Sequence, residues 1–215
     1  MTTKVISFDM DGTLSKMAFT TSVWNEGLPK RYAKTHSVDL EKAKKVVSRE
    51  YDRIGDQDLR WYDLGYWFNR FSLKGAPLTL LEEYEHEVEF YPEVEEVLNN
   101  LQKKYKLVIS SNAADIFISK QLKKLGKKFF SLVFSSISDF NLLKKDPSFY
   151  LKVCHQLRIH PSELIHVGDN CTSDYLSPKK VGISAYYLDR NATKSHDHVV
   201  TNLKELLYRV TNEEV

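Results

Sequence analysis

Two aspartates near the start of the chain, Asp9 and Asp11, have the spacing and the context of a reactive pair. They follow residues 4–8, an apolar run typical of a strand, and they precede Gly12 and Thr13. The glycine indicates that the backbone turns sharply after the strand. Two carboxylates at such a point repel each other unless a cation lies between them or one of them holds a proton. The string Asp-x-Asp-Gly-Thr therefore indicates a site for a cation, for proton transfer, or for both.

Further polar residues follow other apolar runs later in the chain. Ser111 and Asn112 come after one such run, and Asp169 comes after another, with Asp174 five residues further on. In an open parallel sheet, ligands bind beyond the carboxyl ends of the strands. We therefore expect these side chains to meet at one edge of a sheet, together with the first two aspartates.

The elements that must position these residues can be inferred from the hydrophobic pattern. Short apolar runs that alternate with helical segments occupy residues 4–8, 107–109, 132–134, 164–167 and 185–188. Continuous apolar strands that alternate with helices are typical of a parallel sheet covered on both faces. We predict an α/β fold with a doubly wound parallel sheet, flanked by helices that include one near Pro92 and one that begins near Leu203.

Residues 16–88 interrupt this pattern, because they contain no strand signal and are rich in aromatic side chains. Apolar residues recur at helical spacing in 39–54, 57–72 and 77–88. Asp39 or Ser37 could cap the first of these helices, and Pro77 is typical of the start of the last. We predict an inserted α-helical domain at 16–88 and a core formed by residues 1–15 and 89–215.

Composition narrows the class of protein further. The chain has 215 residues and a formal net charge of +2, which argues against a dedicated nucleic-acid binder. Its two cysteines, Cys154 and Cys171, form neither a disulfide framework nor a metal-ligand pattern. Neither a signal peptide nor an apolar run of membrane-spanning length is visible. We expect a soluble cytoplasmic protein with no nucleic-acid or membrane partner; the sequence does not indicate its oligomeric state.

Outside the predicted insertion, four motifs in order resemble those of the haloacid dehalogenase-like hydrolases, a superfamily made up mainly of phosphatases. They are Asp9-Met10-Asp11-Gly12-Thr13, Ser111, Lys144-Lys145-Asp146-Pro147, and Gly168-Asp169 with Asp174. The third motif departs from the common Lys-Pro-Asp-Pro because Lys145 stands where proline is usual, and Ser177-Pro178 stands where Gly-Ala is common. The resemblance implies a Rossmann-like core and a helical cap that closes over the site.

The resemblance, together with the charge of a phosphate ester, assigns a metal site. An aspartate that attacks a phosphate dianion needs cations to neutralise the approach, and oxygen ligands suit Mg²⁺. We expect Asp9 to be both the nucleophile, which forms an aspartyl-phosphate, and a metal ligand. Asp169 would be a second ligand and the backbone carbonyl of Asp11 a third. Asp174 would hold the waters of the metal or orient Lys144.

The remaining expected roles concern the substrate. Lys144 would contact the nucleophile and a phosphoryl oxygen, and Ser111, with its neighbour Asn112, would bind the phosphate. Asp11 is the expected general acid, which protonates the leaving alkoxide and then activates water. Dehalogenases release halide, need no such acid and usually lack this second aspartate. Its presence therefore favours phosphoryl transfer.

The sequence predicts a Mg²⁺-dependent phosphatase that acts on a small phosphorylated metabolite. A phosphomutase or a phosphonate hydrolase of the same fold stays open as an alternative, as does a catalytically idle scaffold that binds proteins. A phosphonate hydrolase would need a Schiff-base lysine in its cap. The lysines of the insertion that leave this open are Lys30, Lys34, Lys42, Lys44 and Lys45.

Aromatic residues of the insertion divide into two predicted groups. Tyr62, Tyr66 and Arg70 lie off the helical stripe of 57–72 and are candidates for a lid that contacts the leaving group. Trp61 and Phe68 lie on the stripe, so we expect them in the core of the insertion.

Overall fold

The core of the protein is one parallel sheet. The structure, a computed structural model, describes residues 3–126, 129–193 and 197–212. Within these residues the sheet has six strands in the order β3-β2-β1-β4-β5-β6, and every neighbouring pair is parallel. The strands are β1 (Val5–Phe8), β2 (Lys106–Ser111), β3 (Leu132–Ser135), β4 (Leu164–Gly168), β5 (Ser184–Leu188) and β6 (Val199–Val200). The predicted doubly wound sheet is confirmed. The two-residue strand β6 was not predicted from the sequence.

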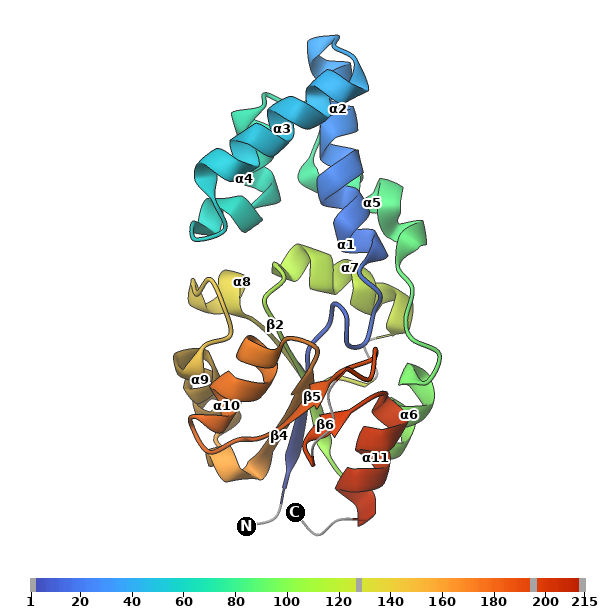
Figure 1. Ribbon diagram of the computed structural model, residues 1–215, viewed down its shortest axis with the longest axis vertical. Helices are drawn as coiled ribbons and strands as arrows, with labels where there is room; N and C mark the ends of the chain where they lie inside the picture. Colours follow the sequence, from blue (N-terminus) through green and yellow to red (C-terminus); the bar gives the residue numbers. More distant parts are fainter. Residues whose placement is uncertain (1–2, 127–128, 194–196, 213–215) are drawn as a thin grey trace.

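Alternation along the strands explains why both faces of the sheet are covered. Ile6 and Phe8 point into one apolar cluster and Val5 points into another on the opposite face. The first cluster lies under α6 (Val94–Leu101), α7 (Asp115–Leu125) and α11 (Leu203–Asn212), and the second lies under α9 (Pro147–Leu157). Figure 1 shows α9 on one side of the strands, and α6 and α11 on the other. The shorter elements of the core are α8 (Ser136–Phe140), η4 (Pro161–Glu163), η5 (Cys171–Leu176) and α10 (Ser177–Lys179).

The chain between β1 and α6 is a helical insertion that stands beyond one end of the sheet (Figure 1). Its elements are α1 (Ala18–Ser22), η1 (Val23–Gly27), α2 (Leu28–His36), α3 (Leu40–Ile54), η2 (Leu59–Tyr62), α4 (Leu64–Arg70), α5 (Pro77–Tyr84) and η3 (Glu85–Glu87). The predicted helical insertion is confirmed, and its exact limits at residues 16 and 88 stay a prediction.

Local signals account for several limits of these helices. Asp39 caps α3, since its carboxylate accepts a hydrogen bond of 2.8 Å from the backbone N–H of Lys42. Pro77 is the first residue of α5, where its missing N–H costs nothing. The segment 57–72, predicted as one helix, is instead split into η2 and α4, because Asp63 between them has extended backbone angles (φ −93°, ψ 103°).

A third apolar cluster holds the insertion together and joins it to the core. Trp67 and Phe68 are buried in it, as predicted for Phe68, and so is Phe117, which belongs to α7 of the core. The rings of Phe19 and Phe117 lie 5.9 Å apart, between the first helix of the insertion and the core. Burying such aromatic rings is a large apolar contribution, so this contact fixes the insertion over α7. In the described part of the chain, no helix is both long enough and apolar enough to span a bilayer.

Candidate active site

Asp9 lies at the carboxyl edge of the sheet, directly after the central strand β1. Its backbone N–H donates to the carbonyl of Val167 over 2.9 Å, so the sheet pairing continues to this residue. β1 lies between β2 and β4, and Ser111 and Asp169 come at the ends of these two neighbours. All three side chains line one cavity of about 460 Å³. The expectation that they meet at one edge of the sheet is therefore met.

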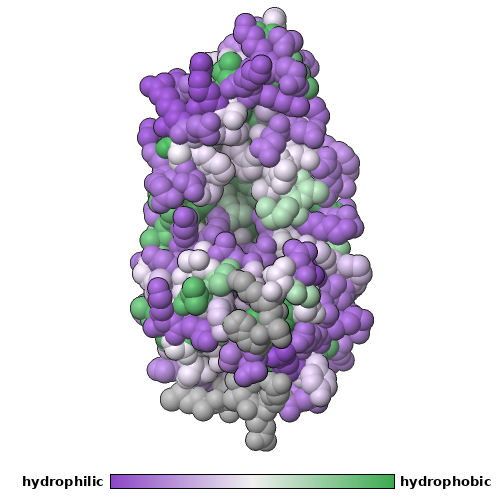
Figure 2. Space-filling view, viewed as in Figure 1, coloured by the Kyte–Doolittle hydropathy of each residue, from purple (hydrophilic) through white to green (hydrophobic). Residues whose placement is uncertain are grey.

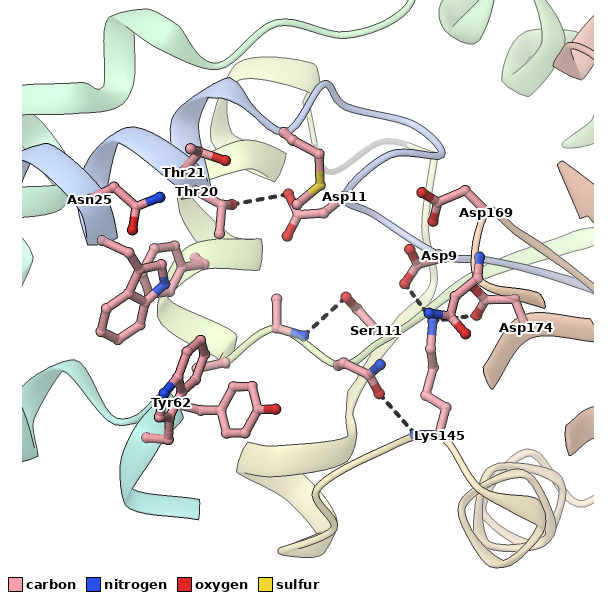
Figure 3. A pocket seen from close by; sticks show the side chains of 18 of the residues that line it. Asp9, Asp11, Thr20, Thr21, Asn25, Tyr62, Ser111, Lys145, Asp169 and Asp174 are labelled. Carbon is pink, nitrogen blue, oxygen red and sulfur yellow. Dashed lines mark hydrogen bonds and ion pairs between the residues drawn. The ribbon is translucent and has the colours of Figure 1, made fainter. Parts of the chain in front are cut away.

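This cavity lies between the core and the insertion, and both parts contribute residues to its lining. Figure 2 shows the molecule hollowed between its two parts, with white and pale green side chains beside the hollow. In Figure 3, Asp9, Asp169 and Asp174 lie on one side of the cavity, whereas Thr21, Asn25 and Tyr62 of the insertion lie on the other. Its volume falls within the range of ordinary small-molecule sites, about 300–1,000 Å³.

A buried lysine, Lys145, lies between the carboxylates on the acidic side of the cavity. Its ammonium lies 2.5 Å from Oδ1 of Asp9, 2.6 Å from Oδ1 of Asp174 and 3.0 Å from the carbonyl oxygen of Ser110. Its side chain is only 1% exposed. Burial pulls the pKa of Lys145 down, but the charges of Asp174 and Asp9 more than offset this and raise it. These two charges therefore favour the cationic form of Lys145 beside Asp9.

Lys144, predicted for this place, lies elsewhere. It is exposed and lines a separate surface pocket, so the assignment of the ammonium to Lys144 was wrong by one residue. The backbone explains the shift. The N–H of Asp146 donates to the carbonyl of Lys144 over 2.9 Å, which closes a tight turn with Lys145 at its centre. The N–H of Lys145 also donates to Oδ1 of Asn112 over 2.8 Å, and this turns its side chain into the cavity.

Asp174 is fixed by protein groups on both oxygens. Oδ1 contacts Lys145 and, at 2.9 Å, Nε2 of His166, while Oδ2 accepts from the backbone N–H of Asn170 over 2.9 Å. Burial raises its pKa, but Lys145 and His166 outweigh burial and hold the pKa of this carboxyl below its usual range. Asp174 therefore pairs with a buried lysine, which is Lys145 and not Lys144. The two roles expected for Asp174, holding the waters of the metal or orienting a lysine, stay predictions.

His166 extends this contact into a buried polar chain that the sequence analysis missed. Its Nδ1 lies 3.0 Å from the hydroxyl of Ser7, and this hydroxyl lies 2.8 Å from the hydroxyl of Ser110. All three residues are fully buried in strands. Burial lowers the pKa of His166, and the opposing charge of Asp174 does not offset this effect. The lowered pKa favours a neutral ring. The sequence did carry a signal for this chain, because β1, β2 and β4 each contain a polar residue within an apolar run. Such buried polar groups require partners.

Three carboxylates form the group that could hold a metal ion. Among the described residues, oxygens of Asp9, Asp169 and Asp174 all lie within 4.8 Å of one another. Burial raises the pKa of Asp9 to about 8, against the pull of Lys145 and with Asp174 adding to the rise. Burial and the charge of Asp174 raise the pKa of Asp169 to about 6. Crowded acids of this kind suit a hard divalent cation, so the residues fit the predicted Mg²⁺.

Two glycines make room for this group. Gly12 has φ +82°, and a Cβ on it would lie 2.1 Å from Oδ2 of Asp169. A Cβ on Gly168 would lie 2.3 Å from Cγ of Asp174. Any side chain at either position would displace a carboxylate of this group, which explains why both positions hold glycine.

The carboxylate of Asp11 lies outside the metal-binding group and has its own partners. Oδ1 accepts from Nε2 of Gln121 at 3.0 Å, from the hydroxyl of Thr20 at 3.1 Å and, more weakly, from Ser15 at 3.5 Å. Burial raises the pKa of Asp11. Gln121 belongs to α7 and Thr20 to α1 of the insertion, and no sequence signal had singled them out. The metal contact expected of Asp11 concerned its backbone carbonyl and stays a prediction.

The two predicted phosphate-binding residues both line the cavity. Ser111 is buried, and its hydroxyl accepts from the backbone N–H of Ala113 over 3.2 Å. Oδ1 of Asn112 accepts from the N–H of Lys145 and, over 3.2 Å, from the hydroxyl of Ser136. Asn112 thus holds the lysine loop in place. Phosphate binding by Ser111 and Asn112 stays a prediction.

The wall contributed by the insertion differs from the predicted lid. Tyr62 lines the cavity, whereas Tyr66 and Arg70 do not. Trp61, expected in the core of the insertion, also lines the cavity and is only half-buried, because the break at Asp63 separates η2 from the stripe of α4. The cap lysines Lys30, Lys34, Lys42, Lys44 and Lys45 are all exposed, and the cavity is lined by none of them.

The parallel doubly wound sheet, the helical insertion after its first strand and the acids at its carboxyl edge define a Rossmann-like α/β domain with an inserted helical domain. The sequence matches the haloacid dehalogenase-like hydrolase family over residues 3–182, and the chain belongs to this family. This confirms the family and the fold that the motifs indicated.

Solved structures agree with this assignment. The chain is similar to a haloacid dehalogenase-like phosphatase from Thermococcus onnurineus, with a TM-score of 0.82 and 25% identity, covering 99% of this chain and 100% of that one. A 2-haloacid dehalogenase from Pseudomonas syringae matches with a TM-score of 0.69 and 21% identity, covering 97% and 98%. At that identity the second likeness concerns the fold alone.

Curated relatives match over shorter segments. Haloacid dehalogenase-like hydrolase domain-containing protein 3 from Danio rerio is 31% identical over 87 residues, 38% of this chain and 36% of that protein. The GMP/IMP nucleotidase YrfG from Escherichia coli is 28% identical over 74 residues, 34% of this chain and 33% of that protein. The chain thus spans about a third of the length of the curated relatives it matches.

Proposed function

We propose that the protein is a Mg²⁺-dependent phosphatase that hydrolyses a small phosphorylated metabolite through an aspartyl-phosphate on Asp9. One observation carries the proposal: Asp9 is paired with the buried cation Lys145 and shares an acidic group with Asp169, inside a cavity of small-molecule size. A carboxylate held beside a fixed cation can approach an anionic phosphate, because the cation offsets the repulsion.

Similar proteins support phosphoryl transfer. The Thermococcus relative is described as a phosphatase, and the Escherichia coli relative as a nucleotidase. Dehalogenases also occur among the similar structures, but this chain has a second aspartate, Asp11, beside the cavity. Halide leaves without a proton, whereas an alkoxide needs one. The additional acid is therefore of use mainly in cleaving an ester.

The first half of the reaction uses three side chains. A carboxylate oxygen of Asp9 attacks phosphorus, the bond between phosphorus and the ester oxygen breaks, and Asp11 donates its proton to the departing oxygen. The ammonium of Lys145 offsets the negative charge of Asp9 as that carboxylate approaches the phosphate. Mg²⁺ bound by Asp9 and Asp169 would supply further positive charge to the phosphoryl oxygens.

The second half returns the protein to its starting state. Asp11, now ionised, takes a proton from water as that water attacks phosphorus, and the bond from phosphorus to Asp9 breaks. Inorganic phosphate leaves and Asp11 is protonated again. The contact of Thr20 with Asp11 links this step to the insertion, which we propose acts as a cap over the site, with limits at residues 16 and 88.

A simple assay tests the proposal. The purified protein is given phenyl phosphate with Mg²⁺, or with EDTA, and inorganic phosphate is measured. We expect release of phosphate that EDTA abolishes and added Mg²⁺ restores. Release that is unaffected by EDTA would contradict the metal assignment, and release of halide from a 2-haloacid without phosphatase activity would contradict the reaction class.

The alternatives give different products. A phosphomutase would return the phosphoryl group to a bound intermediate and release little inorganic phosphate. A phosphonate hydrolase would need a cap lysine in the cavity, and among the described lining residues the one lysine is Lys145, which belongs to the core. An idle scaffold would show no turnover with any phosphate ester, although it would keep the fold.

A further inference from the structure

We infer that the substrate is a phosphate monoester whose leaving group carries an uncharged, planar aromatic ring, bound against the aromatic wall that the insertion presents to the cavity. This inference rests on the proposed phosphatase function and adds the class of leaving group. The aromatic wall is defined as Trp24, Trp61 and Tyr62, with Phe117 of α7 behind it.

The rings of this wall form a continuous surface. Trp24 stacks on Phe117 with centroids 5.5 Å apart and planes 17° apart, and it stacks on Trp61 at 6.1 Å and 27°. Trp61 in turn contacts Tyr62 at 4.8 Å. Trp24, Trp61 and Tyr62 are only half-buried although they line the cavity, so part of their ring surface is open to it. Aromatic surfaces of this kind bind planar rings by stacking.

The wall is also held in place before any ligand arrives. The hydroxyl of Tyr51 donates to the backbone carbonyl of Trp24 over 3.1 Å, and the indole N–H of Trp67 donates to the carbonyl of Trp61 over 2.9 Å. These hydrogen bonds hold the backbone of both tryptophans in place, so the wall needs little further ordering when a ligand binds. A preorganised surface loses less entropy when a ligand binds.

The charges of the cavity exclude an anionic leaving group. Among its described lining residues, Lys145 is the sole cationic side chain, and its ammonium is already taken by Asp9, Asp174 and the carbonyl of Ser110. A second phosphate or a carboxylate on the leaving group would enter an acidic, partly apolar cavity without a counter-ion. Such burial of an unpaired charge is strongly unfavourable.

The order of groups across the cavity fits this assignment. Figure 3 shows the acids and Lys145 at one end and Tyr62, Thr21 and Asn25 at the other, with Asp11 between them. A phosphate on Asp9 therefore directs its leaving group past Asp11 toward the aromatic wall. Thr21 and Asn25 also line the cavity, where a hydroxyl and an amide can bond to neutral ring substituents.

Two sources share this chemistry, a nucleoside monophosphate and a simple aryl phosphate. The first test compares kcat/KM for a purine nucleoside 5′-monophosphate with that for ribose 5-phosphate, because the two share the same ester and differ in the ring. Phenyl phosphate, glycerol phosphate and phosphoglycolate form the other arms. We expect the nucleotide to exceed ribose 5-phosphate by about tenfold to a hundredfold, which is the range of one base stacked on aromatic side chains.

The other arms separate the two sources and the role of charge. A preference for the nucleotide over both ribose 5-phosphate and phenyl phosphate supports the nucleotide source, whereas a preference confined to phenyl phosphate supports an aryl phosphate. Phosphoglycolate should be the poorest of the five substrates. Equal kcat/KM for the nucleotide, phenyl phosphate, ribose 5-phosphate and glycerol phosphate overturns the inference while the phosphatase function stands. Absence of phosphate release from every ester overturns both.

Variants locate the effect on the wall. Trp61→Leu should lower kcat/KM for the preferred aromatic substrate by about tenfold and leave that for glycerol phosphate within about twofold. Trp61→Phe should keep most of the activity, because it keeps a ring. Tyr66→Leu is the matched control, since Tyr66 is an aromatic residue of the same segment that does not line the cavity. An equal loss for both substrates in Trp61→Leu, with the fold retained by circular dichroism, overturns the inference.

Discussion

The hydroxyl of Thr20, on helix α1 of the insertion, donates a hydrogen bond of 3.1 Å to the carboxylate of Asp11, on the loop that follows β1 (Figure 3). The second strong partner of Asp11, Gln121, comes from α7 of the core. The expected general acid is thus held from both parts of the molecule, so its orientation depends on where the insertion sits. Thr20 is a positioning residue in this account.

Replacing Thr20 by valine should slow the cleavage of poor leaving groups selectively. Loss of one hydrogen bond that orients Asp11 should reduce kcat for an alkyl phosphate by about five- to tenfold. Hydrolysis of p-nitrophenyl phosphate should change by less than about twofold, because its leaving group needs little protonation. Steady-state kinetics with both esters provide the comparison.

Thr20→Ser is the control for this experiment, since it keeps the hydroxyl and should restore alkyl-phosphate hydrolysis. If valine reduced both esters by the same factor, Thr20 would act on the fold or on phosphate binding, and the proposed link to the acid would be wrong.

The two adjacent lysines should behave in opposite ways. Lys145→Met removes the cation beside Asp9 and should lower kcat by about 10²–10³, the usual loss for one group that stabilises transition-state charge. Lys144→Met, at an exposed position outside the cavity, should stay within about twofold of the unchanged protein. Activity with phenyl phosphate measures both.

Lys145→Met also leaves Asp9 and Asp174 without their partner, which destabilises a buried pair by about 3–5 kcal/mol. Circular dichroism and thermal melting therefore accompany the assay. Should the methionine variant unfold, Lys145→Arg keeps the charge and still should lose activity, since a planar guanidinium does not fit a site shaped for an ammonium. A folded, fully active Lys145→Met protein would remove Lys145 from the mechanism.

Stabilisation by Mg²⁺ should grow with pH between about 5 and 8. The folded pKa values of Asp9 and Asp169 are raised to about 8 and about 6. Raised carboxyl pKa values mean that the folded state binds more protons than the unfolded one, so metal-free stability from these groups is present at low pH and is lost as pH rises through those values. The lowered pKa of Asp174 acts only in more acidic solution.

Mg²⁺ competes with these protons and so binds more tightly as they leave. At a concentration of about 100 times Kd, a ligand adds about 2.7 kcal/mol to the free energy of unfolding. Melting curves with and without Mg²⁺ at pH 5 and pH 8 test this. The rise in Tm should be larger at pH 8, and in Asp169→Asn it should shrink at both. A rise independent of pH would argue against ion binding at Asp9 and Asp169.

Much of the fold was predictable because its signals are local. Continuous apolar runs predicted β1 to β5, and the acids at their ends predicted the edge where the cavity lies. Asp39 and Pro77 marked helix starts correctly. β6 was missed because two residues carry no periodic pattern, and α1 and α2 were not recognised individually within the helical insertion.

The errors in the site have a common physical origin, since each depends on the direction in which the backbone points a side chain. Lys144 and Lys145 are identical in chemistry, and only the turn closed by Asp146 decides which is buried. Trp61 left the predicted stripe because extended angles at Asp63 interrupt the helix. The contact of His166 with Asp174 spans two elements, so no spacing in one sequence indicates it.

The central claim is that Asp9 attacks phosphorus and carries the phosphoryl group. The most direct measurement quenches the protein with acid during turnover of phenyl phosphate with Mg²⁺, reduces any acyl phosphate with borohydride, and maps the product by mass spectrometry. An aspartyl-phosphate on Asp9 should appear as homoserine at position 9, and Asp9→Asn should give neither homoserine nor turnover. Homoserine at Asp11 or Asp169 instead, or undiminished turnover by Asp9→Asn, would contradict the account.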